Sequence, residues 1–98
     1  MLIHIVTFTF KRGTNAADID AFHSATGRFA GEVPYVRTLR HGPDLGDRPT
    51  NAGYGVVGEF ENADDFYAYL AHPVHKEFLE STVAPVCESW STTQFMTG

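Results

Sequence analysis

Two histidines stand on either side of a proline in the segment Ala68–Phe78, which reads AYLAHPVHKEF. His72 directly precedes Pro73, and His75 follows two residues after it. Histidine has an ordinary pKa close to neutral pH, so such a pair could bind a metal ion or transfer protons. It could equally shape the chain where one helix ends and another begins. The residues around the pair decide among these three roles.

A metal site would need at least one more protein ligand beside the two histidines. Glu77, Glu80 and His4 are conceivable ligands, but none makes a recognised spacing with the pair. Cys87 is the only cysteine, so the chain cannot form an internal disulfide. We therefore expect no metal ion, and no cofactor is suggested by these residues.

For His75 the sequence supports two interpretations. Pro73 suits the first turn of a helix, which places His75 in that same turn. A helix N-terminus disfavours a protonated imidazole, so His75 would be neutral and able to accept a proton. Tyr69 lies six residues earlier, across the helix break, and a phenol next to a neutral imidazole is suited to acid–base chemistry on an enolate. Alternatively, His75 forms a local hydrogen bond and fixes the corner between two helices.

His72 is expected to have a structural role. The residue before a proline is biased away from helical geometry, so His72 should end the preceding helix. Its side chain is also in the right place to accept a hydrogen bond from the first turn of the next helix.

Patterns in the rest of the sequence predict the strands and helices that position the helix break at His72 and Pro73. Apolar and β-branched patterns predict strands over residues 2–10, 35–42, 54–60 and 88–96. Helices are predicted after Asn15 and Asn62, each followed three residues later by Asp, and a third helix from Pro73 until Pro85. The turn-rich segment 43–53 connects the second and third strands.

The resulting order is β-α-β-β-α-(α)-β, which is typical of a ferredoxin-like α+β sandwich. In that fold four antiparallel strands carry helices on one face. We expect a single domain over residues 1–98. The first strand is apolar on both faces, and helices can cover only one of them. We therefore expect a second copy of the chain to cover the other face, giving a homodimeric α+β barrel.

The inward stripes of the helices are rich in aromatic side chains. Their spacing suits either a filled core or the lining of a cavity. The aromatic residues in question are Phe22, Phe29, Phe66, Tyr69 and Phe78. His4 shares a strand face with Leu2, Val6 and Phe8, and it would line the same space, as would Thr26 and Trp90. His23 and His41 are expected at the surface.

Composition excludes several functions. The net charge is −5, with 7 basic and 12 acidic residues, so no general attraction to nucleic acids or anionic membranes is expected. No run approaches the roughly 18 apolar residues of a membrane span. The N-terminal residues follow a strand pattern rather than that of a leader peptide. These features predict a soluble cytoplasmic protein.

Several segments together resemble the stress-responsive A/B barrel family. They are the strand HIVTFTFK, Pro34 after the first helix, the run GYGVVGEFENADDFYAYLAHPVH and the final strand. The most specific part is the motif His-Pro-x-His at His72 to His75. Members of this family are dimeric ferredoxin-like α+β barrels, so the resemblance implies the same fold and assembly. Many members have no assigned activity, and some are stress-associated, highly stable oligomers.

The resemblance also implies roles for individual residues. A plant member of the family is a polyketide cyclase that closes a ring by aldol condensation and decarboxylation without a cofactor. By position, its histidine and tyrosine correspond to His75 and Tyr69, and a pocket histidine on its first strand corresponds to His4. Two further polar pocket positions of that enzyme are occupied here by Gly55 and Thr26, which is a departure from its pattern.

From these observations we expect a small, largely apolar, oxygenated molecule to bind in an internal cavity. The protein would be either a binding protein for such a molecule or a cofactor-free, polyketide cyclase-like enzyme with His75 and Tyr69 as its catalytic acid–base pair. The side chains expected to contact the substrate are His4, Thr26, Phe22 and Phe78. Two alternatives use the same barrel: a cofactor-independent oxygenase, and a non-enzymatic, stress-associated stable dimer.

Overall fold

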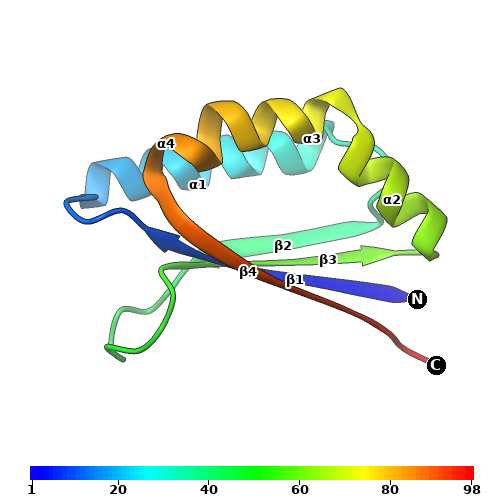
Figure 1. Cartoon of the computed structure of the whole chain (residues 1–98), viewed down its shortest axis with the longest axis horizontal. Helices are drawn as coiled ribbons and strands as arrows, with labels where there is room; N and C mark the ends of the chain where they lie inside the picture. The colour runs from blue at the N-terminus through cyan, green and yellow to red at the C-terminus, as the bar shows by residue number, and fades with distance from the viewer.

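Helices cover one face of a four-stranded antiparallel sheet in the computed structural model, which describes all residues from 1 to 98 (Figure 1). The elements in chain order are β1 (Leu2–Phe10), α1 (Ala16–Glu32), β2 (Thr38–Pro43), β3 (Tyr54–Phe60), α2 (Ala63–Ala71), α3 (Pro73–Phe78), the π-helix η1 (Leu79–Val83), α4 (Ala84–Val86) and β4 (Cys87–Met96). The strands lie in the order β2-β3-β1-β4. This arrangement confirms the predicted ferredoxin-like α+β fold. None of the helices combines the length and apolar character needed to cross a bilayer.

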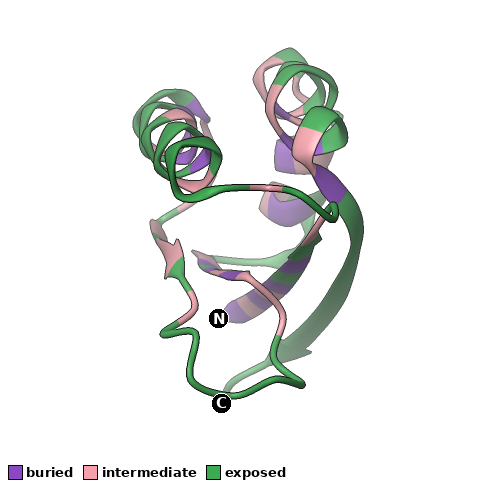
Figure 2. Ribbon diagram, turned by 90° about the vertical axis from the view of Figure 1, so that its left-hand side faces the viewer, coloured by how far each residue is buried: buried purple, intermediate pink, exposed green.

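Strand β1 lies at the centre of the sheet and presents alternate residues to its two faces. Leu2, Val6 and Phe8 are buried beneath the helices, and His4 is buried on the same face. Figure 2 shows that the buried residues gather where the helices face the sheet. The helix-facing side of β1 is therefore both the floor of the core and the element that brings His4 into it.

Helices α1 and α2 begin at the predicted asparagines. The Asn15 side chain accepts a hydrogen bond from the Asp18 backbone N–H at 2.9 Å, and the Asp18 carboxylate accepts one from the Asn15 N–H at 3.1 Å. The Asn62 side chain accepts from the Asp65 N–H at 2.8 Å. Each cap satisfies a backbone donor that the first helical turn leaves free. These caps fix where the helices start over the sheet.

The third predicted helix forms, but it is not a uniform α-helix. Phe78 and Val83 are five residues apart, which would place them about 140° apart around an α-helix. The wider π-turn of η1 between them brings both side chains to the buried face, where Phe78 is 8% and Val83 0% exposed. The helical path then continues through α4 to Val86, so Pro85 lies inside this short helix and does not end it.

Strand β2 begins later than predicted. The sequence pattern predicted a strand from residue 35, but the strand begins at Thr38. Tyr35 has φ 74°, in the left-handed region, which is incompatible with an extended strand. The turn after Pro34 therefore includes Tyr35, and pairing with β3 starts at the Arg37 N–H, which donates to the Glu59 carbonyl at 2.8 Å.

No helix covers the opposite face of the sheet. In the strand register Ile5 lies opposite Val57, and Ile3 lies opposite Phe95. Val57 is 38% exposed and Phe95 46% exposed, so these four side chains form an apolar patch that meets solvent in the isolated chain. A sheet with one solvated face normally carries polar residues on that face.

Candidate functional site

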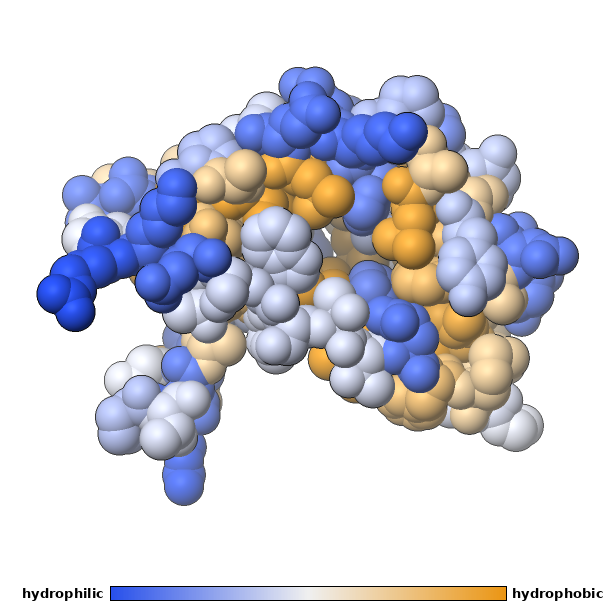
Figure 3. All heavy atoms as spheres, viewed as in Figure 1, coloured by the Kyte–Doolittle hydropathy of each residue, from blue (hydrophilic) through white to orange (hydrophobic).

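A cavity of about 210 Å³ lies between the sheet and the helical layer. Every strand and four helical segments contribute to its lining, and most of the lining side chains are apolar. They are His4, Val6, Phe8, Thr26, Phe29, Leu39, Val56, Tyr69, Leu70, His75, Phe78, Leu79, Trp90 and Thr92. Figure 3 shows a hollow between the helical layer and the strands in this view. An apolar cavity with a few polar groups is the usual form of a small-molecule site.

The corner between α2 and α3 brings Tyr69 and His75 together in this cavity. His72 has extended backbone geometry, with ψ 141°, and ends α2. Its Nδ1 accepts a hydrogen bond from the Val74 backbone N–H at 3.1 Å, so it also caps α3, with Pro73 in the first turn. This confirms the structural role predicted for His72. The chain turns sharply enough that the rings of Tyr69 and His75 lie 4.8 Å apart between centroids.

His75 has a buried nitrogen that forms no hydrogen bond. Its Nδ1 is enclosed by the protein and has no partner. Burial lowers the pKa of His75, and an interaction with the Leu70 backbone opposes this in part. The imidazole is therefore neutral at pH 7 and can accept a proton. A hydrogen bond to the Leu70 backbone agrees with the alternative prediction of a local contact at the corner, while the unpartnered Nδ1 leaves one nitrogen free of such a contact.

The tyrosine of this pair is buried and protonated. Tyr69 is 3% exposed. Burial alone raises its pKa, and no hydrogen bond acts on the phenol to lower it. Its hydroxyl is therefore a hydrogen-bond donor that a bound molecule can use.

His4 approaches the same cavity from β1. It is 4% exposed, and its ring lies 4.9 Å from that of Phe66 and 6.3 Å from that of Tyr69. The Gln94 side-chain amide donates to His4 Nδ1 at 2.8 Å, so the neutral ring carries its proton on Nε2. Burial, and to a smaller extent the nearby His75, lower the pKa of His4 to about 4.

Gln94 is a residue that the sequence did not single out. It lies 90 residues from His4 in the chain, and the two meet only because β4 pairs with β1 in a register that places them opposite each other. Trp90, four residues before Gln94 in β4, lies opposite Phe8 and also lines the cavity. The alternation of β4 against β1 is the signal that would have found Gln94.

The other predicted contact residues fall in two places. Thr26 is fully buried and Phe78 is 8% exposed, and both line the cavity. The Thr26 hydroxyl donates to the Phe22 carbonyl at 2.8 Å, within α1. Phe22 does not line the cavity. Its ring packs 5.2 Å from that of Phe10 and 4.8 Å from that of Tyr54, in the core toward the other end of the sheet.

A second group of polar rings lies near Phe22 and was not foreseen from the sequence. The Tyr54 hydroxyl is 2.6 Å from His23 Nδ1 and 2.7 Å from His41 Nδ1. A phenol has one proton to donate, so it donates to one imidazole and accepts from the other. His23 is exposed as predicted, but His41 is half-buried, and the cluster joins α1 to β2 and β3.

Histidine, cysteine and acidic side chains do not gather in any group of three or more that could hold a metal ion. The side chains with polar groups at the cavity are two neutral imidazoles, a phenol, two threonine hydroxyls and an indole. These groups can accept and donate protons and hydrogen bonds. What the arrangement can do chemically is acid–base work on a small, uncharged or weakly polar molecule.

Comparison with known proteins places this geometry in context. The family model described as "Stress responsive A/B Barrel Domain" matches residues 2–96 of the chain. No curated protein sequence matches it.

Solved structures with the same fold cover almost the whole chain. A dimeric ferredoxin-like protein of unknown function from Thermobifida fusca is 25% identical, with a TM-score of 0.86, and the alignment covers 98% of this chain and 90% of that one. A ferredoxin-like protein of the same family from Mesorhizobium loti is 18% identical, with a TM-score of 0.83 and coverage of 98% and 95%. Hydroxynitrile lyase from Passiflora edulis is 23% identical, with a TM-score of 0.81 and coverage of 99% and 93%.

Proposed function

The chain belongs to the stress responsive A/B barrel domain family, and we propose that it binds a small, largely apolar, oxygenated molecule in its internal cavity. There His75 and Tyr69 would act as an acid–base pair on that molecule without a cofactor. The observation that carries the proposal is the buried, unpartnered Nδ1 of His75 beside the buried phenol of Tyr69.

The energetics favour a functional reason for this arrangement. Leaving a buried polar atom without a partner costs about 1–3 kcal/mol, and such atoms are rare in folded proteins. A residue kept for packing alone would not need the imidazole. A ligand with a polar hydrogen or an oxygen could satisfy His75, while its apolar part contacts Phe78, Leu79 and the β1 side chains.

The protonation states suit proton abstraction next to a carbonyl group. Neutral His75 accepts the proton from carbon, and the electron pair moves to the carbonyl oxygen as an enolate. Tyr69 keeps its proton because burial raises its pKa, and it donates a hydrogen bond to that oxygen. His4 offers a second donor through Nε2. Apolar walls strengthen these interactions by excluding water.

In an aldol-type condensation the enolate carbon could then attack a second carbonyl group, and the resulting alkoxide takes a proton. In the reverse cleavage His75 would remove the proton of a β-hydroxyl group, the carbon–carbon bond breaks, and the enolate that leaves takes a proton. Protonated His75 returns its proton to the product, which restores the starting state. One structural relative is a hydroxynitrile lyase, and this supports the view that the fold can carry a lyase. A cyclase or lyase acting on an oxygenated aromatic or polyketide-like substrate is therefore the favoured class. A stress-associated dimer without activity is the alternative.

We also propose that the chain acts as a homodimer. The apolar patch of Ile3, Ile5, Val57 and Phe95 needs a cover, and the Thermobifida fusca relative is described as dimeric. Replacing Ile5 by Glu would place a charge in the interface. Sedimentation should then show a dimer for the parent chain and a monomer for Ile5→Glu, whereas a monomeric parent chain would refute the dimer.

The enzymatic proposal can be tested before the natural substrate is known. Acetophenone is small, largely apolar and carries an exchangeable methyl group next to its carbonyl. In D₂O the protein should accelerate deuterium incorporation into that methyl group, as measured by NMR. His75→Ala and Tyr69→Phe should each abolish the acceleration, while the exposed control His23→Ala should retain it. If acetophenone binds without exchange, the protein is a binding protein and not an enzyme. If it neither binds nor exchanges, the result favours the inactive dimer.

A further inference from the structure

We infer that the stacked rings of Phe29 and Phe78 form the end wall of the cavity and set the length of the ligand that it accepts. This inference rests on the proposed function, since it assumes that the cavity takes an apolar ligand. It assigns a specificity-determining role to two residues that the acid–base chemistry does not use.

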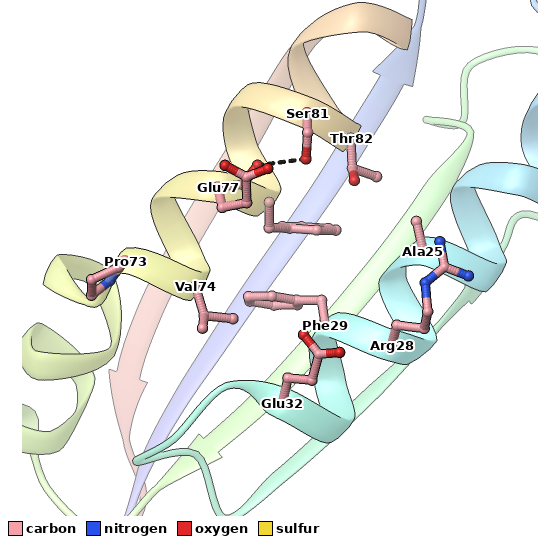
Figure 4. A pocket seen from close by; sticks show the side chains of 10 residues that line it. Ala25, Arg28, Phe29, Glu32, Pro73, Val74, Glu77, Ser81 and Thr82 are labelled. Carbon is pink, nitrogen blue, oxygen red and sulfur yellow. Dashed lines mark hydrogen bonds between the residues drawn. The ribbon is translucent and has the colours of Figure 1, made fainter.

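A groove of about 470 Å³ runs along the outside of the helical layer, between α1 and the path from α3 to η1 (Figure 4). Its rim is polar or small and includes Arg28, Glu32, Glu77 and Ser81. Figure 4 shows Phe29 reaching from α1 toward Val74 on the opposite helix. The groove therefore has an aromatic base beneath a hydrophilic edge.

Only Phe29 and Phe78 line both the outer groove and the inner cavity. Their ring centroids lie 4.1 Å apart with 12° between the ring planes, and the two residues are 5% and 8% exposed. Each ring comes from a different helix, α1 or α3. The two residues shared by the two spaces are thus phenylalanines whose rings stack between α1 and α3.

The size of the inner space makes this wall consequential. At about 210 Å³ the cavity is smaller than the roughly 300–1,000 Å³ of sites for drug-sized ligands. With the wall in place, only a compact ligand fits. If the wall is shortened, the apolar end of a longer ligand can pass between the helices into the groove, where its tip reaches the polar rim.

The Phe29 ring lies 6.0 Å from the rings of both Tyr69 and His75, so the wall adjoins these two polar groups. Tyr69 and His75 lie at the α2–α3 corner, and His4 lies on β1 near Phe66. A para-substituted phenol has the right form as a probe, since its hydroxyl can meet His4 while its alkyl chain points toward the rings of Phe29 and Phe78.

A series from 4-methylphenol to 4-hexylphenol, measured by calorimetric titration, tests the wall. In the parent protein each added methylene should tighten binding by about fourfold while space remains. Because a ligand can fill the cavity only to about the packing density of a protein interior, affinity should stop increasing when the alkyl chain has about three carbons. Phe78→Ala should lengthen the longest alkyl chain that still gains affinity by at least about two carbons, and the milder Phe78→Leu should lengthen it by about one.

Substitutions in the opposite direction and at a matched site complete the test. Phe29→Trp adds volume to the wall and should move the limit to a shorter chain. Phe22→Leu is the control, because Phe22 is a buried phenylalanine of α1 that lines neither space, and its limit should match that of the parent. Circular dichroism verifies that each variant is folded, and Phe78→Leu replaces Phe78→Ala if the latter is not.

The possible failures can be told apart. If the phenols bind the parent but the chain-length limit is the same in the Phe78 and Phe29 variants, the wall is elsewhere and this inference is wrong. If no phenol of any length binds the parent protein, the proposed binding function fails, and the inference fails with it.

Discussion

Two tyrosines of this chain each lie beside histidines, yet their hydrogen bonding is opposite. At the edge formed by α1 and β2, the Tyr54 hydroxyl is bonded to His23 and His41 at 2.6 and 2.7 Å. At the α2–α3 corner, Tyr69 lies 4.8 Å from the His75 ring, and the His75 Nδ1 has no partner. Both phenols are buried, and burial raises both pKa values.

This difference in hydrogen bonding distinguishes a structural role for the Tyr54 cluster from the functional role proposed for Tyr69 and His75. In the Tyr54 cluster the phenol forms hydrogen bonds to both histidines, and these bonds connect α1 to β2 and β3. In the Tyr69 group the His75 Nδ1 is enclosed beside a cavity and has no hydrogen-bond partner. An unsatisfied buried group costs stability, and under the proposed function a bound ligand would offset that cost at His75.

The largest expected effect is the dependence of stability on pH through His4. Its pKa is about 4 in the folded chain and about 6.5 when unfolded, so the unfolded chain binds more protons between these values. The free energy of unfolding should therefore keep its full value above pH 6.5 and fall by about 2–3 kcal/mol as the pH drops toward 4. Urea unfolding at several pH values measures this fall.

His4→Gln should remove most of that pH dependence, because the variant carries no titrating group at the site. His41 also has a pKa lowered by burial and by His23, but it is closer to solvent. His41→Gln should therefore remove a smaller part. An equal fall in parent and His4→Gln would contradict this assignment.

The next effect separates the two tyrosines. Tyr54→Phe removes the shared partner of His23 and His41, and it should lower the free energy of unfolding by about 1–2 kcal/mol. Denaturant unfolding at pH 7 gives the value. If the free energy of unfolding hardly changes, the hydrogen bonds of Tyr54 to His23 and His41 do not stabilise the fold.

His75 should show the opposite sign. His75→Leu exchanges a buried imidazole with an unpartnered nitrogen for an apolar side chain, so the free energy of unfolding should stay the same or rise by up to about 1 kcal/mol. The same denaturant measurement applies, and deuterium exchange into acetophenone should be lost in this variant. A marked loss of stability would favour a structural role for His75.

The smallest expected effect is that of Tyr69→Phe. Its phenol receives no stabilising hydrogen bond, so the free energy of unfolding should change by less than about 0.5 kcal/mol. This variant is the matched control for Tyr54→Phe. A loss as large as that of Tyr54→Phe would remove the distinction between the two groups.

Local patterns predicted much of this molecule. The bounds of β1 and β3, the caps at Asn15 and Asn62, and the break at His72 depend on nearby residues, and all were correct. The approach of Tyr69 to His75 also follows from this break. Here the determining interactions span only a few positions of the chain.

What the sequence missed depends on contacts between distant segments. Gln94 reaches His4 through strand pairing, and three elements meet at Tyr54. The helical spacing of Phe22 suited a cavity, but which part of α1 lies over the hollow depends on how the helix is placed along the sheet. The left-handed turn at Tyr35 overrode a strand-like pattern for a similar reason.

The most direct test of the account is a titration of the protein with 4-ethylphenol, followed by the imidazole signals of ¹⁵N-labelled histidine in NMR spectra. We predict that the His75 and His4 signals shift together and saturate with one dissociation constant, while the His23 and His41 signals stay in place. Shifts confined to His23 and His41, or no shift at any concentration, would contradict the claim that the cavity at the α2–α3 corner is the binding site.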